Sequence, residues 1–131
     1  MRMQAIPTNE CRKAVLPILL AKGVSQNRAE EIELCVGEVI GNCHRHGGDE
    51  EVSLGVEVDD YGIFVQVYAK SHEVHFREIE KAIKQRINKG AELKLPEWGT
   101  SLMQGLAIAC KCSERIDLDE YGGLIMAFAL N

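Results

Sequence analysis

A carboxylate and a carboxamide lie one helical turn apart in the first third of the chain. Glu38 and Asn42 are four residues apart, so on an α-helix they stand one above the other, and Arg45 shares their face. A carboxylate can deprotonate a hydroxyl group or water, an amide oxygen suits Mg²⁺, and a guanidinium group can neutralise phosphate charge. The spacing therefore fits chemistry at a phosphate-bearing ligand, but the same residue types also occur on helix faces that contact only solvent.

A long amphipathic helix is predicted to position these three side chains. Ser25 is a suitable N-cap, and the helix is expected to end near His46, where residues 47–49 turn the chain. Its packing side is an apolar stripe with a period near 3.6, made of Ile32, Val36, Val39, Ile40 and Cys43. The polar face that carries Glu38 lies roughly 120° from this stripe, so packing and chemistry are assigned to different sides of one helix.

The other segments predict a layer of strands beside the helices. Thr8 is expected to cap an earlier helix that Pro17 bends or splits and that Gly23 ends. Periodicity predicts strands at 52–58, 63–69, 115–118 and 124–130, helices at 76–89 and 99–110, and a loop at 90–98. A turn separates the two strands of each pair, so both pairs are expected to form hairpins. The sequence thus predicts one domain, residues 1–131, with an α+β two-layer sandwich in which helices pack on one face of a mainly antiparallel sheet.

Composition excludes several classes of protein. The net charge is −5 and 46% of the residues are hydrophobic, which argues against a disordered chain and against a nucleic-acid-binding surface. The apolar stretch 14–21 is too short for a membrane span and lacks the pattern of a signal peptide. Five cysteines at irregular spacing, without a secretion signal, favour reduced thiols in the cytoplasm. We therefore expect a cytoplasmic protein that binds neither nucleic acid nor membrane.

A zinc site and a redox motif are weaker alternatives. Cys43, His44 and His46 could contribute metal ligands, but structural zinc needs four well-spaced ligands, and Cys43 lies on the apolar stripe. Cys110 and Cys112 do not have the spacing of a Cys-x-x-Cys motif. Ordinary core and surface positions are the better interpretation of these cysteines.

Glu38-x-x-x-Asn42-x-x-x-His46 resembles the N box of the GHKL ATPase superfamily, and more narrowly that of the anti-sigma-factor serine kinases. These bacterial regulators switch partners with STAS-domain antagonists. They are similar to this chain in length, in the leading helix, in the run 29–34 before the N box and in the hairpin after it, so the resemblance covers nearly the whole sequence. It implies the Bergerat-type ATPase fold, a regulatory role exercised on a sigma factor or a STAS-domain protein, and a homodimer.

The resemblance also implies roles for individual residues. Glu38 would match the general base that activates the attacking serine hydroxyl, and Asn42 would match the ligand of the Mg²⁺ ion that accompanies ATP or ADP. Arg45 and His46 would lie at the phosphate and lid side of the pocket, with residues 76–98 as the lid. Phosphates would be held at a helix start by the second glycine box, which corresponds here to Gly99, Thr100, Ser101 and Leu102.

Several positions depart from the family pattern at the adenine end of the implied pocket. The first glycine box reads Asp-x-Gly-x-Gly before a phenylalanine; aligned on Phe76, this chain has Ser71 for the aspartate, and Glu73 and His75 for the glycines. Leu124 stands where a threonine is expected. Loss of a charge-assisted hydrogen bond to adenine costs about 1.5–3 kcal/mol, or roughly ten- to a hundredfold in affinity. Two functions therefore remain open: an ATP-dependent serine kinase, and a degenerate module that keeps the ATPase fold and binds proteins without nucleotide.

Overall fold

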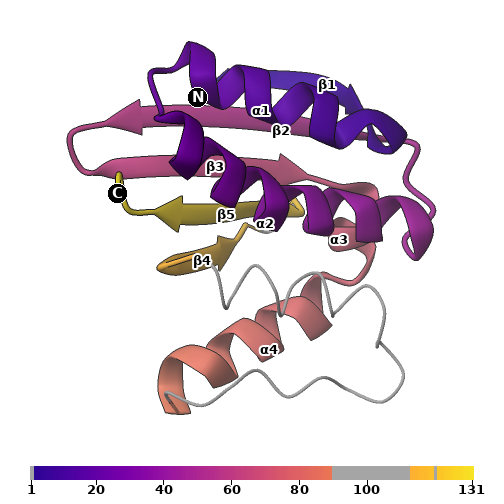
Figure 1. The fold of residues 1–131 in the computed structure, drawn as a ribbon. Coiled ribbons are helices and arrows are strands. Elements are labelled where there is room, and N and C mark those ends of the chain that lie inside the picture. Colours follow the sequence, from indigo (N-terminus) through magenta and orange to yellow (C-terminus); the bar gives the residue numbers. More distant parts are fainter. Residues whose placement is uncertain (1, 90–112, 120) are drawn as a thin grey trace.

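A five-stranded antiparallel sheet forms one layer of the molecule (Figure 1). The computed structural model describes residues 2–89, 113–119 and 121–131, apart from the side chains at positions 12, 82 and 85–89. The strands are β1 (Met3–Pro7), β2 (Glu51–Asp59), β3 (Gly62–Tyr68), β4 (Arg115–Leu118) and β5 (Gly123–Phe128). Their order is β1-β2-β3-β5-β4 and every neighbouring pair is antiparallel, so β1 and β4 form the two edges.

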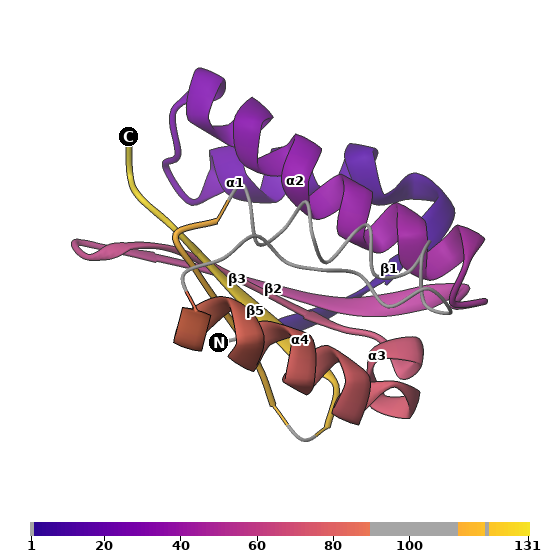
Figure 2. The same ribbon diagram turned by 90° about the horizontal axis from the view of Figure 1, so that it is seen from below.

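Two long helices cover one face of this sheet. α1 (Cys11–Ala21) and α2 (Gln26–Arg45) lie side by side on it (Figure 2), and a 3₁₀ turn, η1 (Thr8–Glu10), leads into α1. After β3 come α3 (Lys70–Val74) and α4 (Phe76–Lys89), and α4 lies beside the edge strand β4 (Figure 1). The predicted α+β sandwich is confirmed. Among the described residues, no helix combines the length and apolar character that a bilayer crossing requires.

The main core lies between the sheet and the α1–α2 layer. Inward-facing side chains alternate along the central strands, where Ile63, Val65 and Val67 on β3 and Leu124 and Met126 on β5 are all 0% exposed. The apolar stripe predicted for α2 is buried as well, with its five residues at most 2% exposed. Because full burial of a large aliphatic side chain contributes about 1.5–3 kcal/mol, this stripe determines which face of α2 is left for polar residues.

Most predicted elements after residue 24 are confirmed. α2 begins after Ser25, whose Oγ accepts a hydrogen bond from the Arg28 N–H at 3.4 Å. Both hairpins form, β2 with β3 and β4 with β5, and the helix predicted at 76–89 is α4. The loop predicted at 90–98 and the helix predicted at 99–110 lie outside the described residues.

The start of the chain differs from the prediction. Residues 3–7 form β1, which was not expected because Ile6 is its one buried side chain and no apolar alternation marks it. Thr8 does not cap a helix, since the N-cap of α1 is Glu10, without a side-chain hydrogen bond. Instead the buried Thr8 hydroxyl donates to the backbone oxygen of Asp49 at 2.7 Å, which ties η1 to the start of β2.

Pro17 does not split the first helix, and a further short helix was not predicted. α1 is continuous from Cys11 to Ala21. Proline has no backbone N–H, so the backbone oxygen of Lys13 lacks its usual helical hydrogen bond. Both residues are exposed, and water can donate to this oxygen instead. Lys70–Val74, for which no element was predicted, forms α3, in which Ser71 and His72 are buried.

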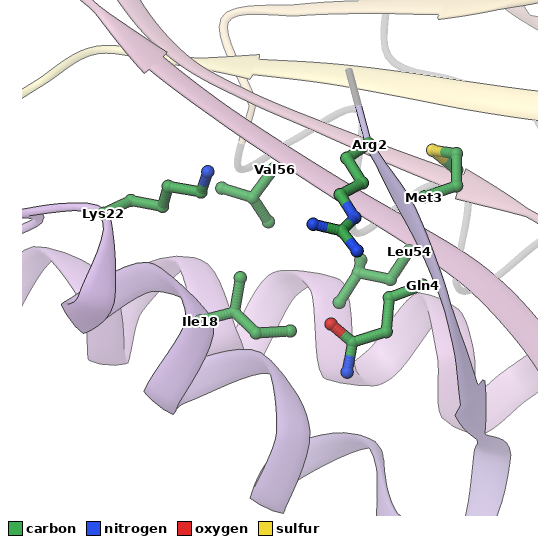
Figure 3. A pocket seen from close by; sticks show the side chains of 7 residues that line it. All are labelled: Arg2, Met3, Gln4, Ile18, Lys22, Leu54 and Val56. Atoms are coloured by element: carbon green, nitrogen blue, oxygen red, sulfur yellow. The ribbon is translucent and has the colours of Figure 1, made fainter.

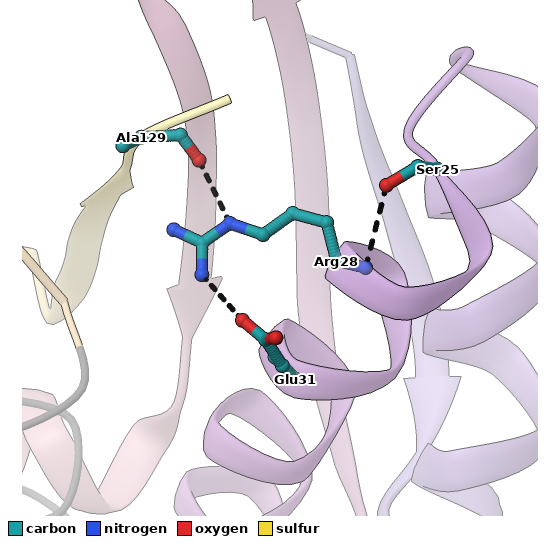
Figure 4. A network of polar contacts seen from close by, with 4 residues as sticks. All are labelled: Ser25, Arg28, Glu31 and Ala129. Atoms are coloured by element: carbon teal, nitrogen blue, oxygen red, sulfur yellow. Dashed lines mark hydrogen bonds and ion pairs between the residues drawn. The ribbon is translucent and has the colours of Figure 1, made fainter. Parts of the chain in front are cut away.

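One arginine fastens the end of β5 to the first turn of α2. Arg28 Nε donates to the backbone oxygen of Ala129 at 2.8 Å, and its Nη1 lies 2.8 Å from Oε2 of Glu31 (Figure 4). The Arg28 side chain is 17% exposed, whereas that of Glu31 is 65% exposed. The bond to Ala129 is therefore the better shielded of the two.

We expect Arg28→Ala to lower the free energy of unfolding by about 1–2 kcal/mol, because the Ala129 oxygen loses a charged donor. Glu31→Ala is the matched control and should cost less than about 0.5 kcal/mol, because it removes only an exposed ion pair. Urea unfolding followed by circular dichroism measures both values. Equal losses in the two variants would assign the effect to the ion pair instead.

Candidate functional site

The structure brings Glu38, Asn42 and Arg45 together on the polar face of α2. Arg45 Nη2 donates to Asn42 Oδ1 at 3.0 Å and lies 3.6 Å from Glu38 Oε2. Gly41 leaves room for this arrangement, because a Cβ atom there would lie 2.9 Å from Arg45 Nη1. The shared face expected from the spacing is therefore present, with the guanidinium group folded back along the helix.

The oxygen atoms of this group suit a hard cation, but one of them is already engaged. Asn42 is only 6% exposed, and its Oδ1, the atom expected to bind Mg²⁺, accepts a hydrogen bond from Arg45. Carboxylate and amide oxygens are the ligand types that Mg²⁺ takes beside nucleotide phosphates. Glu38 and Asn42 therefore fit the metal end of a nucleotide site, provided that Arg45 turns away from Asn42.

The remaining predicted residues are further from this arrangement. His46 follows the last turn of α2, where its N–H donates to the Asn42 backbone oxygen at 2.9 Å and its side chain is exposed. Gly99, Thr100, Ser101 and Leu102 lie outside the described residues.

A second polar group, which the sequence did not predict, lies beneath the end of α2. Asp49 and Ser71 are 8% and 5% exposed. Ser71 donates its backbone N–H to Asp49 Oδ1 at 3.2 Å and its hydroxyl to Asp49 Oδ2. The N–H of Asp49 donates in turn to the backbone oxygen of Cys43 at 3.0 Å. Asp49 thereby connects the end of α2 with α3 across 22 residues of sequence.

Cys43 and His72 form a neutral buried pair beside Asp49. Cys43 Sγ lies 3.4 Å from His72 Nε2, and His72 is 4% exposed. Burial lowers the pKa of His72 to about 4, against the opposing charge of Asp49, and burial raises the pKa of the Cys43 thiol to about 12. His72 Nδ1 is the one buried side-chain nitrogen or oxygen in the described part of the chain without a hydrogen-bond partner.

This arrangement gives no support to a zinc site. Cys43 is buried, whereas His44 and His46 are exposed, and His44 Nδ1 lies 2.7 Å from Thr8 Oγ1. Within the described ranges there is no group of three or more His, Cys, Asp or Glu side chains that could hold a metal ion.

At the adenine end, the residues that replace the family pattern make contacts within the protein. The Ser71 hydroxyl is occupied by Asp49, and Leu124 is 0% exposed in the core. Tyr68 donates its hydroxyl to Glu73 Oε2 at 2.5 Å, a bond that lowers the pKa of the Glu73 carboxyl. α3 also packs against the β4–β5 turn, where a Cβ atom on Gly122 (φ +88°) would lie 2.7 Å from the Glu73 nitrogen. These residues do not fit an adenine ring held by an aspartate and a threonine.

A pocket of about 430 Å³ adjoins the N-box face, the polar face of α2 that carries Glu38, Asn42 and Arg45, on the side of η1 and α1. Its polar lining includes Asn9 and Glu10 from η1, Lys13 from α1, and His44 and Arg45 from α2. Arg45 therefore borders both this pocket and the Glu38–Asn42 pair.

Comparison with known proteins identifies the domain. The family model of the histidine kinase-like ATPase domain matches residues 5–124. This range includes α1, α2, β2, β3 and β4 in full, most of β1 and the start of β5. No curated protein matches the chain. With the sheet, the helix layer and the N-box face in agreement, the chain belongs to the family of histidine kinase-like ATPase domains.

Proposed function

We propose that this domain is a cytoplasmic regulator of transcription of the anti-sigma-factor type, which acts by switching between a sigma factor and a STAS-domain antagonist. Of the two modes that the sequence leaves open, protein binding without nucleotide has the stronger support. The observation that carries this choice is the buried Asp49–Ser71 contact. Ser71, which replaces the aspartate that accepts a hydrogen bond from adenine in the family pattern, donates to a neighbouring carboxylate.

The retained N box does not require a nucleotide. A buried amide oxygen needs a hydrogen-bond donor, and Arg45 supplies one to Asn42 within the same helix. Glu38 then lies next to the charge that Arg45 brings. The three residues therefore form a group that is satisfied within the helix and can persist for the stability of α2 alone.

A serine kinase is the second candidate, and the geometry of Glu38 supports it. Its side chain is 38% exposed, and its Oε2 lies 3.6 Å from Arg45 Nη2. In this candidate Glu38 would accept the proton of a serine hydroxyl on the partner protein, and Arg45 would neutralise charge on the transferred phosphoryl group. Asn42 would hold the Mg²⁺ ion that accompanies the nucleotide.

A thermal-shift titration with Mg²⁺-ATP and Mg²⁺-ADP separates the two candidates. A ligand present at 100 times its Kd stabilises the folded state by about 2.7 kcal/mol, so even a weak site is detectable at millimolar nucleotide. We expect no shift. A Mg²⁺-dependent shift that Asn42→Ala abolishes would contradict the nucleotide-independent mode and favour the kinase, with Glu38→Ala still binding but no longer transferring phosphate. Asn27→Ala, an exposed asparagine on the same helix, is the matched control.

The regulatory role has its own test, independent of nucleotide. Calorimetric titration of the domain with purified sigma factors and STAS-domain proteins should give binding to at least one of each, with mutual competition. Binding that is equally strong with and without Mg²⁺-ATP is expected. Binding to neither class would contradict the partner-switching role whatever the thermal shift shows.

A further inference from the structure

A small pocket lies at the edge of the sheet, between β1, β2 and the end of α1. Its volume is about 280 Å³. Ile18 of α1 and Leu54 and Val56 of β2 form its apolar wall, and Met3 of β1 also lines it. It shares no lining residue with the pocket beside the N box, so it is a separate feature of the fold.

Three polar side chains surround the apolar wall of this pocket. Gln4 lies opposite Leu54 in the β1–β2 register and on the same face of β1 as the buried Ile6, two residues away. A position that continues the core-facing row therefore carries an amide. Figure 3 shows Arg2 and Lys22 reaching toward the pocket from opposite sides of Val56.

The charge of this pocket is opposite to that of the molecule. The chain has 20 acidic and 15 basic residues, yet none of the described residues that line the pocket is acidic and two are basic. Two cations beside an apolar wall are complementary to an anion with an apolar body. A small hydrated inorganic anion would leave the wall formed by Ile18, Leu54 and Val56 without a contact.

We propose that this pocket binds an aliphatic carboxylate. The Arg2 guanidinium group can hold both carboxylate oxygens in a forked contact, Lys22 adds a point charge, and the Gln4 amide can donate a further hydrogen bond. The alkyl chain lies against Ile18, Leu54 and Val56. A mainly apolar lining with a few converging polar groups is the usual character of a small-molecule site. This assignment does not depend on the proposed regulatory function, because no residue of the N box takes part.

Methyl-detected NMR titration with octanoate tests the proposal. We expect saturable shifts of the Ile18, Leu54 and Val56 methyl signals, and a neutral analogue, octanamide, should bind about tenfold more weakly because it lacks the charge. Arg2→Gln and Lys22→Gln should each weaken octanoate binding roughly three- to tenfold. Lys84→Gln makes the same change of charge at an exposed position of α4 and should leave octanoate binding unchanged.

Three results would overturn the carboxylate assignment. The first is that octanoate at millimolar concentration shifts none of the three methyl signals. The second is that octanamide binds as tightly as octanoate, and the third is that inorganic phosphate produces the same shifts. A further titration identifies the source of the carboxylate. Competition by the peptide acetyl-Leu-Glu-Leu-amide assigns it to a protein segment, and octanoate binding without such competition assigns it to a free acid; both support the site.

Discussion

Replacing Asp49 with alanine is expected to lower the free energy of unfolding by about 4 kcal/mol. The carboxylate accepts two hydrogen bonds from Ser71, one from the backbone N–H and one from the hydroxyl. Both partners are buried, and each buried donor left without an acceptor costs about 1–3 kcal/mol. Urea unfolding followed by circular dichroism gives the value.

Three further variants show whether this loss belongs to the Asp49–Ser71 contact. Asp49→Asn keeps one acceptor oxygen and should lose about half as much. Asp60→Ala removes an exposed aspartate from the β2–β3 turn and should change stability by less than about 0.5 kcal/mol. In a double-mutant cycle, Asp49→Ala and Ser71→Ala should couple by about 1–3 kcal/mol. A loss below about 1 kcal/mol in Asp49→Ala would show that water satisfies Ser71 in its place.

The Asp49–Ser71 contact also shows why half of the candidate site could not be predicted. The N-box face is a local property of one helix: a cap at Ser25, a stripe of period 3.6, and Glu38 and Asn42 four residues apart suffice to place it. Asp49 and Ser71 are 22 residues apart, and in sequence each is typical of a turn or loop. Only the packing of α3 against the end of α2 makes them partners.

The edge strand β1 was not predicted, for a related reason. A half-buried strand is recognised by alternating apolar residues, but β1 has one buried side chain, Ile6, in five residues. Its pairing with β2 supplies what its own sequence lacks, since Ile6 lies opposite Val52 in the core-facing row. Strands in the middle of the sheet, such as β3, are buried at every second residue and were predicted correctly.

The two ends of the nucleotide site that the resemblance implies therefore differ in how well they match the family pattern. At the phosphate end, Glu38 and Asn42 keep the residue types of the family's N box, and Arg45 contacts both of them. At the adenine end, Ser71 is tied to Asp49 and Leu124 belongs to the core. Affinity for a nucleotide depends on contacts at both ends. The stability of the fold requires only that the buried polar groups at each end have hydrogen-bond partners within the protein. Arg45 satisfies the first and Asp49 the second, which supports the proposed mode without nucleotide.

Acid is expected to destabilise the domain through His72. Burial lowers the pKa of His72 from 6.5 to about 4. The negative charge of Asp49 opposes this shift, and the positive charge of His75 adds to it. Between these pH values the unfolded chain binds more protons than the folded one, so the free energy of unfolding falls as the pH decreases from about 6.5 to 4. The His72 contribution to this fall is about 3 kcal/mol, at 1.36 kcal/mol for each pKa unit. Above pH 6.5 it should be flat.

The variant His72→Gln isolates this contribution, because glutamine does not titrate. The variant lacks the contact with Cys43, so its stability at pH 7 can differ from that of wild type for this reason alone. The informative quantity is therefore the slope of its free energy of unfolding against pH. Urea unfolding at intervals from pH 7 to 4 should show that wild type loses about 3 kcal/mol more than His72→Gln over this range. His46→Gln, which replaces an exposed histidine, should keep the wild-type slope. Parallel curves for wild type and His72→Gln would contradict this prediction, because they would mean that the His72 ring takes up its proton without unfolding.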